Sequence, residues 1–370
     1  MRKGRVSPTS IPCKRVNSGG ALKKSLKLIA VAASLTLITG VAVAPSAQAA
    51  KIKLCLALDT GGVDDRSFNE GAWKGAQAST VSTAEYLSAA SSADFAPNIK
   101  KFVDKGCDLI VGVGFAISAE IVKSAKANPK IKYAVVDDAG EDCDANFNCK
   151  PVANVKGLTF QTDEAAFMAG YLAAGVSRTG KVATYGGAPY PTVTIFMDGY
   201  ARGVDYYNKQ KGKSVKVLGW DPANPKSGTF VGNFSDQTKA LTISKGFEQQ
   251  GADVILPVGG NLGAPYAAES EKSKKSLTIW VDSDGFGLLT AGKTILLTTV
   301  VKEIGASIKS VAKDVANKKF NGSKYVGTLK NKGVSIAPYH DQSSRVPGAL
   351  KLEVRKIRDA IIAGTLKVSA

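Results

Sequence analysis

Histidine is almost absent from this chain, which contains one in 370 residues. That residue, His340, lies in a polar turn beside Tyr339 and Asp341, and none of the five cysteines forms a Cys-x-x-Cys pair. Because histidine and cysteine supply most zinc ligands, we expect no metal site. The sequence also lacks a Gly-x-Ser-x-Gly motif, which argues against a Ser-His-Asp hydrolase. We therefore expect neither a catalytic residue nor a cofactor.

Acidic residues are absent from the first 49 positions, which hold eight Lys or Arg. An uncharged stretch from Leu28 to Ala44 comes next, and the segment Pro45 to Ala49 then places small residues where signal peptidase cuts. The sequence predicts a signal peptide over residues 1–49, cleaved after Ala49, and export to the periplasm or cell surface. A signal anchor is the alternative, because 17 uncharged residues approach the roughly 20 that span a bilayer. No lipid-attachment cysteine follows the uncharged stretch, so we expect an unlipidated protein.

The excess of positive charge is moderate once the predicted signal is set aside. The formal net charge of +18 falls to +10, with 41 Lys or Arg against 31 Asp or Glu. Lysine clusters such as Lys272, Lys274 and Lys275 are typical of solvated helix faces, so we expect no nucleic-acid partner. The roughly 320 residues after the signal suffice for two domains of about 100–200 residues each.

The cysteines after the predicted signal fall into two pairs. Cys143 and Cys149 lie close together in a polar stretch, and export to an oxidising compartment favours a disulfide between them. Cys55 and Cys107 lie in apolar, strand-like runs, and we expect them to be buried free thiols.

Short apolar runs alternate with amphipathic segments of helical period, which indicates an α/β protein with parallel sheets. The predicted strands are 52–58, 108–113, 132–137, 155–160, 181–186, 215–220, 253–258, 277–281 and 295–301. The predicted helices are 67–79, 116–127, 163–176, 192–210, 236–250, 263–274, 302–317 and 348–363. This number of strands favours two doubly wound sheets.

Polar and glycine-rich residues follow several of the predicted strands. The turn from Asp59 to Asn69 holds three carboxylates, two glycines, an aromatic ring and an amide, although it could also be an ordinary turn with Asp65 or Ser67 as N-cap. Further strands run into Asp137-Asp138, Gly259 to Gly263 and Asp282 to Asp284. Because ligands bind beyond the carboxyl ends of such strands, these segments predict a ligand-binding cleft.

A series of segments resembles the basic membrane protein family of ABC-transporter substrate-binding proteins, which includes purine nucleoside receptors. In chain order the matching segments are 59–69, 111–115, 134–137, 164–171, 232–236, 259–260, 281–284 and 298–302. The resemblance implies a type I periplasmic-binding-protein fold, with two doubly wound parallel-sheet lobes joined by a three-strand hinge. It implies crossings near residues 158, 288 and 325, so that lobe I spans 50–158 plus 288–325 and lobe II spans 159–287 plus 326–370.

The same resemblance implies roles for individual residues. Phe68 and Phe234, one from each lobe, would sandwich a purine ring, an arrangement that suits any flat heterocycle. The other implied ligand contacts are hydrogen bonds between the ligand and Asn69 and Asp137, close backbone approach at Gly260, contacts of Asp282 and Lys302 with the base edge or ribose hydroxyls, and further contacts of Asp59 and Ser67. The partners implied are a nucleoside and the membrane permease of an ABC importer, and we expect a monomer.

Three other functions deserve comparison. A sugar or furanose-signal receptor of the same fold stays open, because sugar sites also combine stacked aromatics with carboxylates and amides. An NAD-type enzyme is disfavoured, because the segment from Gly112 to Gly114 lacks the third glycine of the dinucleotide motif and does not follow the first strand. A transcriptional repressor is disfavoured because the chain begins with an export signal instead of a helix-turn-helix.

Overall fold

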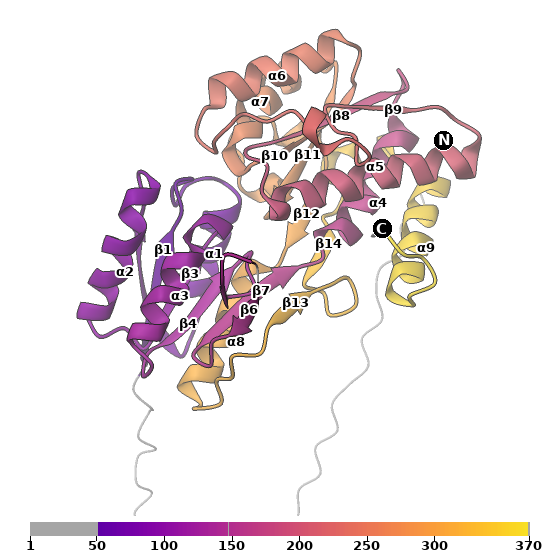
Figure 1. The fold of residues 1–370 in the computed structure, drawn as a ribbon. Coiled ribbons are helices and arrows are strands. Elements are labelled where there is room, and N and C mark those ends of the chain that lie inside the picture. Colours follow the sequence, from indigo (N-terminus) through magenta and orange to yellow (C-terminus); the bar gives the residue numbers. More distant parts are fainter. Residues whose placement is uncertain (1–50, 147, 369–370) are drawn as a thin grey trace, which may run out of the picture. The chain divides into compact units, whose positions relative to one another are not determined.

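The computed structural model describes residues 51–146 and 148–368, which form two six-stranded sheets, and Figure 1 shows their order along the chain. The predicted signal peptide lies outside the described residues. No helix of the described part is long and apolar enough to cross a membrane.

The first sheet has the strand order β13-β7-β4-β3-β1-β2, and every neighbouring pair is parallel. Its strands are β1 (Ile52–Leu58), β2 (Ser82–Ser88), β3 (Leu109–Val113), β4 (Lys132–Val136), β7 (Val155–Phe160) and β13 (Tyr325–Gly327). Helices α1 (Phe68–Gln77) and α8 (Ile304–Ala316) share one buried cluster with this sheet. Helices α2 (Phe95–Asp104) and α3 (Ser118–Ala127) share a second cluster, formed by the alternate side chains of the same strands. We call this sheet and its helices the first lobe.

The second sheet has the order β14-β12-β11-β10-β8-β9, with β14 antiparallel to β12. Its strands are β8 (Lys181–Gly186), β9 (Lys216–Leu218), β10 (Val254–Val258), β11 (Leu277–Asp282), β12 (Leu296–Lys302) and β14 (Val334–Ile336). One face packs on α4 (Thr162–Val176), α5 (Pro191–Lys211) and α9 (Gly348–Ile362), and the other on α6 (Gln237–Gln249) and α7 (Ala264–Ser273). We call this the second lobe.

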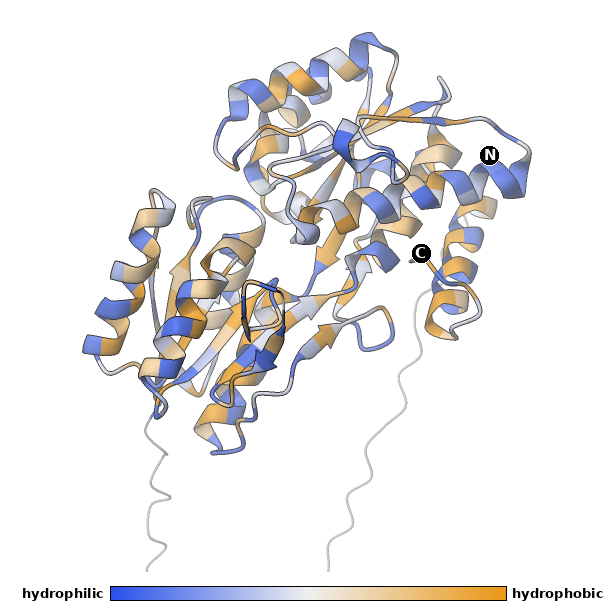
Figure 2. Cartoon of the chain, in the orientation of Figure 1, coloured by the Kyte–Doolittle hydropathy of each residue, from blue (hydrophilic) through white to orange (hydrophobic). Residues whose placement is uncertain are grey.

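Coverage by helices on both faces explains why the central strands are continuously apolar. All five residues of β3 and of β10 are buried. Figure 2 shows hydrophobic residues concentrated in the strands, whereas hydrophobic and hydrophilic residues alternate along the helices. The expected α/β fold of two doubly wound lobes is therefore confirmed.

Three stretches carry the chain between the lobes, and they lie side by side. Backbone hydrogen bonds join Gln161 N to Gly327 O (2.8 Å) and Glu303 N to Gly333 O (2.9 Å). Gln161 follows β7, Glu303 follows β12, and the segment 328–333 joins β13 to β14.

The sheet pairing corrects one expected lobe boundary. The family resemblance implies that residues 288–325 belong to lobe I, but β12 pairs with β11 and β14 of the second sheet. We therefore propose that the second crossing follows Lys302 instead of lying near residue 288. The sheet to which a strand belongs depends on which strands become its neighbours. The apolar pattern of β12 does not indicate those neighbours.

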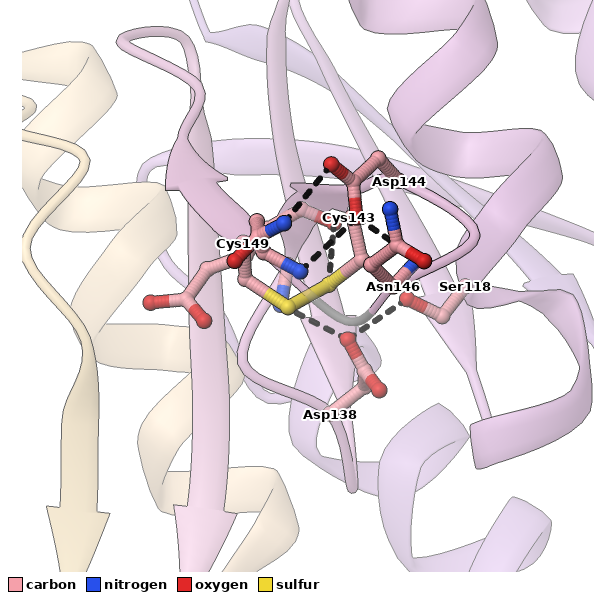
Figure 3. Close-up of a disulfide and its surroundings, with 9 residues drawn as sticks. Ser118, Asp138, Cys143, Asp144, Asn146 and Cys149 are labelled. Atoms are coloured by element: carbon pink, nitrogen blue, oxygen red, sulfur yellow. Dashed lines mark hydrogen bonds between the residues drawn. A yellow bond between two sulfur atoms is a disulfide. The ribbon is translucent and has the colours of Figure 1, made fainter.

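The expected disulfide between Cys143 and Cys149 is confirmed, and it joins the hairpin strands β5 (Glu141–Cys143) and β6 (Cys149–Pro151). Figure 3 shows it beside Asp138, whose carboxylate accepts a hydrogen bond from Ser118 Oγ at 2.6 Å. Asp144 orders the turn of the hairpin by accepting hydrogen bonds from the backbone N–H groups of Asn146 and Asn148. The hairpin thus continues directly from the residues that follow β4.

The expectation of free thiols at Cys55 and Cys107 is wrong, because these residues form a second disulfide. Both are buried, as expected, at 1% and 2% exposure. The pairing arises because Cys107 precedes β3, which lies beside β1 with Leu109 opposite Leu54. Burial can be judged from local sequence, whereas this partnership depends on strand order.

Candidate ligand-binding site

A cavity lies between the carboxyl ends of the two sheets, with about 750 Å³ of space including its open mouth. Eight of the nine expected ligand-binding residues line it, namely Asp59, Phe68, Asn69, Asp137, Phe234, Gly260, Asp282 and Lys302. The ninth, Ser67, lies behind the wall, where its Oγ is 2.8 Å from Val281 O and 2.9 Å from Asp282 Oδ2. Residues distant in sequence thus converge at one place, as the strand-end rule requires.

The strands position the charged side chains directly. Asp59 and Asp137 follow β1 and β4, whereas Asp282 and Lys302 are the last residues of β11 and β12. Asp137 and Asp282 have φ angles of 68° and 66°, a left-handed conformation that few residues other than glycine and Asp or Asn adopt. Such backbone strain concentrates at functional sites, because it aims a side chain where a regular strand would not.

Lys302 is the centre of a buried ion cluster that joins the lobes. Its Nζ lies 2.8 and 2.7 Å from the carboxylate oxygens of Asp137 in the first lobe, and 3.5 Å from Asp282 Oδ1 in the second. Burial raises the pKa of Asp137 to about 6, and the ion pair with Lys302 opposes that rise. Burial alone would lower the pKa of Lys302, but Asp137 and Asp282 outweigh it and raise the pKa. At neutral pH Lys302 is a cation and Asp137 a carboxylate.

The turn before α1 is held by Asp65. Its carboxylate accepts hydrogen bonds from the backbone N–H groups of Ser67, Asn69 and Glu70 at 2.8–3.1 Å. Ser67 occupies the N-cap position but makes no side-chain cap bond, so Asp65 satisfies the helix terminus. Burial raises the pKa of Asp65 to about 7, and these backbone hydrogen bonds oppose that rise.

Asn69 is fixed by one half of its amide and has the other half unpaired. Its Nδ2 donates to Asp59 Oδ1 at 2.7 Å, while Asn69 Oδ1 is buried with no partner among the described residues. Burial raises the pKa of Asp59, and the hydrogen bonds from Asn69 and Gly61 oppose that rise. A buried acceptor without a donor is costly, so this oxygen is suited to a donor on a ligand.

Aromatic rings form much of the remaining wall. Phe68 and Phe234 are half-buried and come from the first and second lobe, respectively. Lys302 Nζ lies 4.8 Å from the centroid of the Phe68 ring, so a cation covers one face of that ring.

Four further aromatic residues line the wall without having been predicted as ligand contacts, namely Phe95, Phe115, Tyr190 and Phe196. The strand-end rule could have found Phe115, because it follows β3 by two residues, and Tyr190, which immediately precedes α5. Phe95 and Phe196 are helical residues, and nothing in their local sequence distinguishes them from ordinary core residues.

Two α/β lobes, three crossings and a polar and aromatic cavity between the strand ends define a two-lobe solute-binding protein. The chain belongs to the Bmp family, described as ABC transporter substrate-binding protein PnrA-like, which matches residues 52–369. The expected resemblance is thereby confirmed. Proteins of this family are extracytoplasmic and bind a small molecule for a membrane permease.

Several individual proteins are similar to this chain. The chain is 28% identical over 338 residues to the ABC transporter nucleoside-binding protein BmpA of Lactococcus lactis, covering 86% of this chain and 89% of that protein. It is 29% identical over 315 residues to basic membrane protein A1 of Borrelia garinii, covering 84% and 86%. Among solved structures, the solute-binding protein of the ABC transporter system from Aeropyrum pernix K1 is similar in fold, with a TM-score of 0.72 and 22% identity over 85% of this chain and 92% of that one. The Lactococcus lactis protein is described as a nucleoside-binding protein and the Aeropyrum pernix protein as a solute-binding protein.

Proposed function

We propose that this protein binds a nucleoside, with a purine base between Phe68 and Phe234, and delivers it to the permease of an ABC importer. The observation that carries the proposal is the placement of these two rings on different lobes around one cavity. Lys302 Nζ lies over the Phe68 ring, and Phe68 lines the cavity. The nucleoside-binding name of the Lactococcus lactis relative supports the same ligand class.

The polar groups of the cavity favour a ligand that donates hydrogen bonds and carries no negative charge. Asn69 Oδ1 is an unpartnered acceptor, and Asp59, Asp137 and Asp282 add carboxylate oxygens around it. Among the described residues, Lys302 is the one Lys or Arg of the cavity wall, and it already pairs with Asp137. Ribose hydroxyls and base N–H groups satisfy such acceptors, whereas a phosphate would be repelled.

Calorimetric titration of residues 50–370 with adenosine, guanosine, inosine and ribose tests the proposal, after any co-purified molecule has been identified by native mass spectrometry. We expect at least one purine nucleoside to bind, and Phe68→Ala to weaken its binding more than about tenfold through loss of stacking and contact area. Phe286→Ala is the matched control, since this half-buried ring stacks on His340 outside the cavity. Binding of ribose without any nucleoside would instead support the sugar-receptor alternative.

A further inference from the structure

Besides the Lys302 ion cluster and the hydrogen bonds of Ser67 Oγ, two further sets of contacts join the lobes beside the cavity, and the first set is polar and partly buried. Trp280 Nε1 donates to Arg66 O at 3.1 Å, and Ser283 Oγ donates to Ser67 O at 2.9 Å. Trp280 and Ser67 are 1% and 0% exposed. These bonds connect the turn after β1 with the end of β11.

The second contact is aromatic and half-exposed. The rings of Phe115 and Tyr190 lie 5.4 Å apart at an interplanar angle of 39°, and Tyr190 lies 6.0 Å from Phe234 at 32°. Phe115 belongs to the first lobe, whereas Tyr190 and Phe234 belong to the second. Of the aromatic ring pairs in the described part of the chain, Phe115–Tyr190 is the one that joins the lobes.

Glycines next to these rings set their positions. Gly114 has a φ of 120°, and a Cβ there would lie 2.8 Å from Asp59 Oδ2, so only glycine lets the chain turn into Phe115. A Cβ at Gly187 would lie 2.4 Å from the Phe234 ring, so its absence lets that ring rest against the backbone. Phe234 in turn supports Tyr190. The local sequence therefore presents one ring from each lobe to the other.

We propose that Phe115 and Tyr190 form an aromatic latch that holds the lobes closed and slows the release of bound ligand. This inference rests on the proposed function for the ligand, but the latch itself is a contact between protein side chains. Each of the two residues affects ligand release through its contact with the other ring, so both are positioning residues. An inclined aromatic pair strengthens the closed state by an amount equivalent to about a threefold to tenfold change in the rate of opening.

A double-mutant cycle on the ligand dissociation rate tests this latch, measured by stopped-flow with the nucleoside that binds most tightly. We expect Phe115→Leu and Tyr190→Leu each to raise the dissociation rate about threefold to tenfold, and the double variant to be no faster than the faster single variant. Phe286→Leu alters a ring outside the cavity and should dissociate like the unaltered protein. Rate effects of Phe115→Leu and Tyr190→Leu that multiply in the double variant would overturn the latch.

Small-angle scattering of the purified proteins gives a readout that requires no assigned ligand. We expect Phe115→Leu and Tyr190→Leu to increase the radius of gyration, while Phe286→Leu, which alters a ring outside the cavity, leaves it unchanged. Melting curves verify that each variant is folded. If no nucleoside binds but the radius increases, the nucleoside assignment fails and the latch stands. An unchanged radius of gyration in both Phe115→Leu and Tyr190→Leu would contradict the latch.

Discussion

Asp65 accepts hydrogen bonds in the turn before α1 at a position that solvent barely reaches. The hydrogen bonds favour its ionised form, whereas burial disfavours that form. Its carboxylate binds three backbone N–H groups at the start of α1, yet it is 5% exposed. Burial raises the pKa of Asp65 from 3.8 to about 7. The order of the turn before α1 is therefore coupled to the protonation of Asp65.

The stability of the protein should reflect that proton. Because the pKa of Asp65 is higher in the folded than in the unfolded state, its stabilising contribution is fully present below pH 3.8 and is lost as the pH rises through about 7. We expect the stability difference between the unaltered protein and Asp65→Asn to shift by about 2 kcal/mol against the unaltered protein from pH 5 to pH 8. Urea unfolding of both proteins at each pH measures it.

The neighbouring Asp64→Asn provides the control, since Asp64 is exposed and makes none of the backbone bonds that hold the turn. Its stability difference from the unaltered protein should be similar at both pH values. A difference for Asp65→Asn that does not change with pH would show that the proton has no part in ordering this turn.

Residue types at the strand ends were predictable, whereas their geometry was not. A carboxylate after a buried strand indicates a site, so Asp137 and Asp282 could be chosen from sequence. Their left-handed backbone and the meeting of both with Lys302 depend on three strands from two sheets. Tyr190 was missed although the strand-end rule covers the turn between β8 and α5, in which it lies four residues beyond the strand.

At the scale of elements, the Cys55–Cys107 disulfide ties β1 to the start of β3. These adjacent strands lead to Asp59 and to Phe115, which both line the cavity. The bond closes a loop with a sequence separation of 52 residues, against 6 for Cys143–Cys149. The longer loop restricts the unfolded chain more strongly.

Removal of each disulfide should therefore cost different amounts. We expect the Cys55→Ala/Cys107→Ala variant to lose about 4 kcal/mol of unfolding free energy and the Cys143→Ala/Cys149→Ala variant about 2 kcal/mol. Denaturant unfolding of the two variants beside the unaltered protein measures the difference. Thiol titration of the denatured, unreduced mature protein should find no free thiol, and two free thiols would contradict the first bond.

Edge elements were the parts of the fold that sequence concealed. The edge strand β2 has the sequence Ser-Thr-Ala-Glu-Tyr-Leu-Ser, and its mixed burial gives no apolar run to detect. Strands β13 and β14 have three residues each, too few for a periodic pattern. The long buried strands were predictable, because their composition follows from coverage on both faces. Most helices were predicted as well, but α2 (Phe95–Asp104) was missed although it is amphipathic.

At the scale of the whole molecule, we propose that the exported form is a monomer that begins at Ala50. Residues 1–49 lie outside the described part of the structure, so this rests on the basic segment, the uncharged stretch and the small residues at Ala47 and Ala49. Intact mass spectrometry of the secreted protein should give the mass of residues 50–370 without acyl chains. A mass that includes residues 1–49, or an acylated one, would contradict cleavage or the absence of lipid.

The position of Lys302 has a mechanical consequence. It is the last residue of β12, and the chain leaves the second lobe at the next residue, Glu303. Any axis of rotation between the lobes passes near the crossings, and displacement grows with distance from it. Phe115 follows β3, which lies two strands from β7, and Tyr190 follows β8, which lies three strands from β12. At about 4.8 Å between neighbouring strands, Phe115 is about 10 Å and Tyr190 about 14 Å from the crossings. A small rotation would therefore separate the rings of Phe115 and Tyr190, while the end of the cavity at Lys302 hardly moves. A departing ligand would leave the cavity with the end farthest from Lys302 first.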